Sequence, residues 1–170
     1  MRAGAHYLER YATSTENFRR VLTRKVRRRM MLRDENEADH APLIDAVTAR
    51  FAELGFLDDV SFAEAKVRSL RRKGVSSRMV EAKLSEKGVE RSVIEAVTAE
   101  DETTESEAAH SYAKRRRLGP WRLRNRTERR DRDVAAMMRA GFSYGLAAAV
   151  IDLETDDLAL ADDVSQVEAG

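Results

Sequence analysis

The sequence contains no cysteine, so it can form neither a disulfide framework nor a thiolate metal site. Its longest uninterrupted apolar stretch, Leu146–Ile151, is far shorter than the roughly 20 residues that a membrane-spanning helix needs. The opening residues reach charge within ten positions and lack the apolar core of a secretory signal peptide. These absences predict a cytoplasmic protein that does not enter a membrane.

Motifs for catalysis and for cofactor binding are also missing. No phosphate-binding loop, dinucleotide fingerprint or nucleophile elbow occurs, and the glycines are isolated. The histidines, His6, His40 and His110, lie far apart and lack the paired spacing of metal ligands. We therefore expect no catalytic residue, no metal, no cofactor and no small-molecule substrate. The chain is predicted to act by binding and not as an enzyme.

Charge is abundant and unevenly distributed. The formal net charge is +1, yet residues 152–170 hold seven acidic residues and no basic one, which leaves 31 basic against 23 acidic residues elsewhere. Eight basic residues fall within 19–33 and ten within 114–132. Such runs are typical of a surface that binds a polyanion, although a solvated helix surface would show them too.

Apolar residues recur at helical spacing and strand-like alternation is missing, which predicts an all-α fold. Nine helices are expected, and the last three should lie at about 106–118, 129–140 and 143–154. The starts of four others are marked by capping residues or by a first-turn proline, namely Ser14 or Thr15, Pro42, Asp58 or Asp59, and Ser76 or Ser77.

The helices repeat in threes. A shift of 62 positions places Ser14 on Ser76, and a shift of 53 positions places Gly88 on Gly141, together with the neighbouring apolar anchors. The matches concern packing and turns, and they predict tandem three-helix repeats that stack into an elongated, curved body with a disordered acidic tail. The predicted boundaries are 1–57, 58–100 and 106–154 for the repeats and 155–170 for the tail.

Asp58 and Asp59 are the only neighbouring carboxylates worth testing as acid–base groups. They precede an amphipathic helix, where a carboxylate accepts an unpaired amide and suits the helix dipole. We interpret the pair as helix-capping residues, and an enzyme that uses them remains the weaker alternative.

Two basic clusters end equivalent helices in the repeat. The helix dipole favours cations there, but four in a row exceed what a helix end requires, so we expect a surface that faces phosphates or carboxylates. Trp121 could stack on a base or fill a junction between helices, and the second reading is favoured. The candidate partner- and DNA-binding residues are Arg68, Arg71, Arg72, Lys73, Lys114, Arg115, Arg116 and Arg117.

The segment 54–63 resembles the signature of the RecX family, in which an apolar residue and paired acids lead to Phe-Ala, and the similarity continues through 67–74 and 84–89. The resemblance implies tandem three-helix repeats, binding to RecA nucleoprotein filaments, and restraint of recombination, ATP hydrolysis and coprotease function. Direct contact with single- or double-stranded DNA stays open. The structural signature positions are Leu57, Asp58, Asp59, Phe62, Ala63 and Gly88.

A helix-turn-helix transcriptional regulator is the alternative, because each unit has three helices and residues 87–89 resemble such a turn. A recognition helix should expose basic or amide side chains at its start. The helix after Gly88 instead offers Glu90, Arg91, Ser92 and Glu95, which disfavours reading of a DNA groove.

Overall fold

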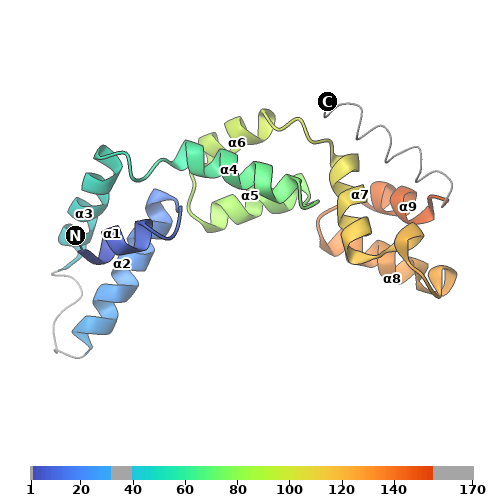
Figure 1. Cartoon of the computed structure of the whole chain (residues 1–170), viewed down its shortest axis with the longest axis horizontal. Helices are drawn as coiled ribbons and strands as arrows, with labels where there is room; N and C mark the ends of the chain where they lie inside the picture. The colour runs from blue at the N-terminus through green and yellow to red at the C-terminus, as the bar shows by residue number, and fades with distance from the viewer. Residues whose placement is uncertain (1, 32–39, 155–170) are drawn as a thin grey trace. The chain divides into compact units, whose positions relative to one another are not determined.

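The computed structural model describes residues 2–31 and 40–154. Within these ranges the chain forms nine α-helices and a short 3-10 helix, η2, and contains no strand (Figure 1), so the all-α prediction is confirmed. The predicted acidic tail lies outside the described residues. The helices are α1 Arg2–Leu8, α2 Thr15–Met30, α3 Ala41–Glu53, α4 Asp59–Arg71, α5 Ser77–Glu86, α6 Arg91–Ala99, α7 Glu105–Arg116, η2 Gly119–Trp121, α8 Arg126–Arg139 and α9 Tyr144–Asp152.

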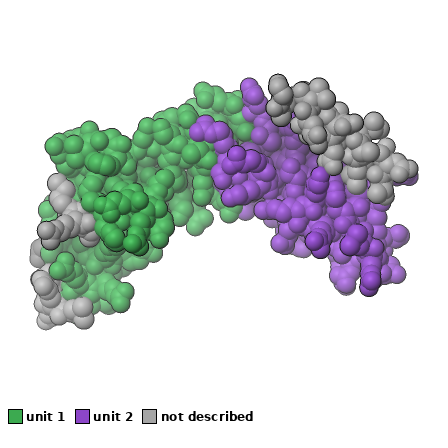
Figure 2. Space-filling model, in the orientation of Figure 1, with its two compact units in different colours: residues 1–67, 81–101 green, residues 68–80, 102–170 purple. Residues whose placement is uncertain are grey.

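The chain divides into two compact units (Figure 2). The first unit comprises residues 1–67 and 81–101, and the second comprises residues 68–80 and 102–170. Helices α4 and α5 therefore contribute to both units. The division into repeats at 1–57, 58–100 and 106–154 and the elongated, curved form stay predictions.

One buried cluster of the first unit lies between α2 and α3, and further buried residues of this unit lie on α4, α5 and α6. Phe18 from α2 is fully buried and meets the ring of Phe51 from α3 edge-on, with 5.4 Å between the ring centroids. Leu22, Ile44 and Leu57 complete the buried cluster. Phe18 and Leu22 are four residues apart and so lie on one face of α2. The apolar residues that recur at helical spacing in the sequence therefore form the face of α2 that packs against the core.

The core of the second unit is built from α7, α8 and α9. Helix α7 contributes only alanines to the buried cluster, and their small side chains let the neighbouring helices approach closely. Met137 from α8 and Val150 from α9 are almost completely buried in the same cluster. Phe142 is also buried in this cluster, and the partly buried Tyr112 packs against it with ring centroids 5.6 Å apart.

The main difference from the expected helices is at α8, which begins at Arg126 and not near residue 129. The Arg126 guanidinium donates to the carbonyls of Ile151 (3.2 Å) and Leu153, which fixes the first turn of α8 against the end of α9. Helix α8 therefore begins about one turn earlier than the sequence predicted. No helix in the described ranges is long and apolar enough to cross a membrane.

Candidate partner interface and the polar junctions behind it

A first polar junction joins the start of α2 to α4 and to the turn after α5. The Asp59 carboxylate accepts hydrogen bonds from the Thr15 amide (2.7 Å) and hydroxyl (3.0 Å). The Ser14 hydroxyl caps α2 by accepting from the Asn17 amide (3.2 Å) and donates to the Lys87 carbonyl. Because the first amides of a helix have no partner within it, Asp59 stabilises α2 from a distant part of the chain.

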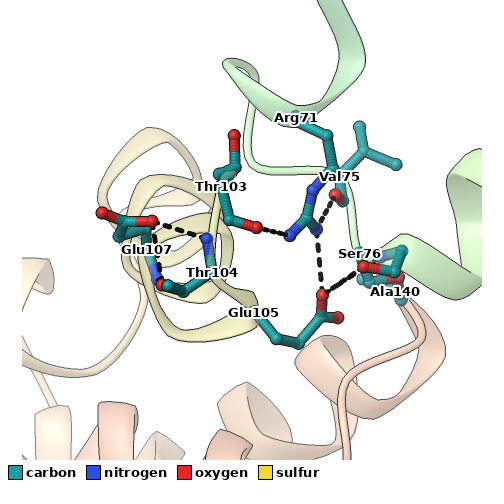
Figure 3. Close-up of polar contacts among 9 residues, drawn as sticks. Arg71, Val75, Ser76, Thr103, Thr104, Glu105, Glu107 and Ala140 are labelled. Carbon is teal, nitrogen blue, oxygen red and sulfur yellow. Dashed lines mark hydrogen bonds and ion pairs between the residues drawn. The ribbon is translucent and has the colours of Figure 1, made fainter. Parts of the chain in front are cut away.

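A second junction in the other unit has the same chemistry (Figure 3). The Glu105 carboxylate, from the first turn of α7, accepts from the Ser77 amide (3.2 Å) and hydroxyl (2.8 Å) at the start of α5. The Ser76 hydroxyl donates to the Ala140 carbonyl (2.7 Å) in the turn after α8. Ser76 and Ala140 thus take the places that Ser14 and Lys87 hold in the first junction.

Glycine is required beside both junctions for steric reasons. Gly88 and Gly141 follow the accepting carbonyls and have φ angles of +74° and +97°, which L side chains rarely adopt. A Cβ on Gly88 would overlap the Glu16 side chain, and one on Gly141 would overlap the Ser76 side chain. The serine and glycine matches in the sequence repeat therefore report one recurring contact between helices.

The paired acids have separate structural roles. Asp58 caps α4 by accepting from the Ser61 amide (3.0 Å) and hydroxyl (2.7 Å). These two hydrogen bonds hold the pKa of the Asp58 carboxyl below its usual value, and the bond from the Ser61 amide has the larger effect. Asp59 belongs to the first junction instead. One member of the pair caps its own helix, as predicted, and the other caps a different helix.

The predicted basic surface must be corrected at Arg71, because the Arg71 side chain is only 2% exposed. Its guanidinium donates to the Val75 carbonyl (3.0 Å), to the Glu105 carboxylate (2.9 Å) and to the Thr103 carbonyl (Figure 3). Arg71 follows the buried Ala63 and Val67 at intervals of four residues and so lies on the packed face of α4. It bridges residues of the second junction and is buried there, unlike the other arginines of the run.

The other predicted basic residues lie on the surface of the second unit. We call the exposed Arg68, Arg72 and Lys73 the α4-end cluster and the exposed residues Lys114, Arg115, Arg116 and Arg117 the α7-end cluster. The Arg115 guanidinium lies 5.8 Å from the centroid of the Tyr112 ring. Arg117 ends α7 in a left-handed conformation with φ of 54°.

Trp121 packs against the core of the second unit, and the His110 ring meets it edge-on with 6.3 Å between centroids. Its position agrees with the predicted role as a filler between helices. The residue after Trp121, Arg122, forms an ion pair with the buried Asp133 of α8 that the sequence did not reveal. Asp133 accepts two bonds from the Arg122 guanidinium (2.8 and 2.6 Å) and one from the Gly119 amide (3.0 Å).

The Asp133 side chain is 3% exposed, and its burial by itself raises the pKa. The hydrogen bonds from Arg122 and from the Gly119 amide outweigh that burial, so the pKa of Asp133 lies below its usual value. Arg122 and Asp133 are eleven residues apart, and no local pattern marks them as partners. Among the described residues, no group of three His, Asp or Glu side chains is arranged to hold a metal ion.

Comparison with known proteins identifies the family. The family model "RecX, second three-helix domain" matches residues 58–97. "Regulatory protein RecX" of Myxococcus xanthus is 39% identical over 154 residues, which cover 88% of this chain and 82% of that protein. The chain belongs to the RecX family. The match begins at Asp58, which caps α4, and it includes Arg71 and Ser76 of the second junction.

Further relatives of the RecX family agree. "Regulatory protein RecX" of Thermobifida fusca is 33% identical over 149 residues, covering 86% of this chain and 80% of that protein. The Agrobacterium fabrum protein of the same name is 38% identical over 102 residues, or 59% of this chain and 54% of that protein. No solved structure matches the chain. The family identification and the prediction of a regulatory, non-enzymatic protein are confirmed by these relatives.

The structure also bears on the helix-turn-helix alternative. Helix α6 would be the recognition helix, and its exposed side chains near the start include Glu90, Arg91 and Glu95. The Arg91 guanidinium pairs with the Glu95 carboxylate at 2.6 Å within the same helix. A surface with two carboxylates would be repelled by DNA phosphates, so α6 does not suit insertion into a DNA groove.

Proposed function

We propose that this RecX-family chain binds RecA–DNA filaments and modulates the RecA recombinase, with inhibition of recombination, ATP hydrolysis and coprotease activity as the expected direction. The proposal rests on identity to RecX proteins over most of their length. The sequence holds no nucleotide-binding motif, so the chain must act by binding one state of the filament more tightly than another. Because RecA–DNA filaments form on chromosomal DNA, we expect this chain to act in the cytoplasm.

The α4-end and α7-end clusters are the proposed contact surface. Together they present seven exposed cations on the second unit, and phosphates of the filament DNA or carboxylates of RecA would complement them. The two polar junctions support the proposed division into repeats. Ser14 and Thr15, at the start of the second helix of the first repeat, bond to Lys87 and Asp59 of the second. Ser76, before the second helix of the second repeat, bonds to Ala140 of the third, and Ser77 bonds to Glu105, one residue before the third repeat begins.

Co-sedimentation tests the proposal directly. The full chain is pelleted with RecA on single-stranded DNA, with and without nucleotide, and RecA ATP hydrolysis is measured in parallel. We expect the chain to pellet with the filament and to slow hydrolysis. Absence of the chain from the pellet under both nucleotide conditions would contradict the proposal.

Charge reversal locates the surface. R68E/R72E/K73E and R115E/R116E/R117E should each weaken co-sedimentation and flatten its salt dependence, because about 0.7–0.9 counterions are released for each phosphate contact made. The control is R50E/R91E, since both arginines are exposed, lie in the first unit and pair with a glutamate of their own helix. Affinity and salt slope equal to the wild type in both triple variants would show that apolar contacts carry recognition.

A further inference from the structure

A nearly fully exposed leucine lies between η2 and α8. Leu123 is 89% exposed, more than any other large apolar side chain among the described residues. Isolated apolar side chains on a surface are ordinary and need no explanation. Leu123 becomes informative through the way its loop is held and through the charge around it.

The loop is anchored on both sides of Leu123. Before it, Arg122 makes its two bonds to the buried Asp133 carboxylate. After it, Arg126 donates to the carbonyls of Ile151 (3.2 Å) and Leu153 at the end of α9. An apolar side chain on an anchored loop loses little backbone entropy when a partner covers it. The loop therefore presents Leu123 in a conformation that is already set.

The positive charge around Leu123 indicates what kind of partner would cover it. Segment 114–132 carries ten basic and two acidic residues, and the adjacent Arg124 is exposed, as is Arg117 before η2. Nucleic acid combines phosphates, which suit these arginines, with stacked bases, between which leucine side chains are known to insert as wedges. Trp121 cannot take this role, because it is packed against the core of the unit.

We propose that Leu123 inserts between adjacent bases of DNA while the arginines beside it hold the flanking phosphates. This inference deepens the proposed function, because it rests on the DNA of the RecA filament being a partner of the second unit. Insertion separates two stacked bases and is expected to bend the DNA locally. Leu123 would then supply binding energy that does not depend on salt, alongside the salt-dependent contacts of the arginines.

The test uses the full chain and duplex DNA that carries 2-aminopurine, whose fluorescence rises when the base loses its stacking neighbour. We expect the wild type to raise the fluorescence on binding. L123A should remove this rise and weaken binding about tenfold, as expected for losing burial of most of a leucine side chain. L123M should keep both properties. L43A is the matched control, because Leu43 is also exposed, at 62%, but lies on α3 in the first unit.

The outcomes separate this inference from the proposed function. Absence of DNA binding by the wild type, binding without a fluorescence rise, or a rise that L123A retains would each overturn the wedge. Co-sedimentation with RecA reports on the proposed function independently. A wild type that pellets with the filament but leaves 2-aminopurine stacked would refute only the wedge, whereas a fluorescence rise without RecA binding would refute only the proposed function.

Discussion

Replacing Arg71 with methionine should destabilise the second unit strongly, although Arg71 belongs to a run of basic residues that otherwise lies on the surface. Methionine retains the length and the apolar part of the side chain and removes the guanidinium. The carbonyls of Val75 and Thr103 and one oxygen of Glu105 would each lose a donor. Hydrogen bonds that involve a charged group contribute about 1.5–3 kcal/mol each.

The three bonds are not lost in full. Glu105 keeps its bonds from Ser77, and its side chain is 37% exposed, so water can replace part of what Arg71 supplies. We expect a loss of about 3–5 kcal/mol, the range typical of removing one partner from a buried ion pair. Such a loss is a large share of the roughly 5–15 kcal/mol that stabilises a domain.

Urea denaturation followed by far-ultraviolet circular dichroism measures the effect. With a denaturant slope of about 2 kcal/mol per molar, the unfolding midpoint of R71M should fall by about 2 M. The control is R72M, one residue further on, where the side chain is exposed and a change within about 0.5 kcal/mol is expected. R71K should recover little, since an ammonium lacks the planar fork of the guanidinium.

Two results would refute this reasoning. If R71M and R72M unfolded at the same urea concentration, the buried network would contribute nothing to stability. If R71M kept the wild-type midpoint but no longer pelleted with RecA filaments, Arg71 would be a contact residue, as the sequence alone suggested.

Three further predictions follow from the same structure. G88A and G141A should each lower the melting temperature measured by circular dichroism, because both positions combine a positive φ with a contact too close for a Cβ, while G145A, in an open helical position, should not. The pKa of Asp133 is lower in the folded state than in the unfolded chain, so its carboxylate stabilises the fold above about pH 4, and this contribution is lost as the pH falls through the folded-state pKa. D133N should therefore unfold at a lower urea concentration than the wild type at neutral pH, and its stability should depend less on pH. Removal of residues 155–170 should strengthen co-sedimentation with RecA filaments if their acids compete for the basic clusters, and unchanged or weaker pelleting would exclude that competition.

The sequence by itself determined what depends on neighbours a few residues apart. The apolar spacing of Phe18 and Leu22, the cap at Asp58 and the glycines that follow α3, α4, α5 and α8 are local signals, because helix geometry relates residues three or four positions apart. The family could also be recognised, since the segment 54–63 carries its pattern in consecutive residues.

Only the tertiary structure decided which charged residues are buried. Arg68, Arg71 and Arg72 belong to one basic run, and the spacing from Ala63 and Val67 can place Arg71 on the packed face of α4, but only the fold shows that Thr103 and Glu105, more than thirty residues further along the chain, pair with it. Asp59 likewise caps a helix whose start lies 44 positions before it. A charged side chain can be buried only where distant groups pair with it, and the sequence does not show which distant groups meet until the helices have packed.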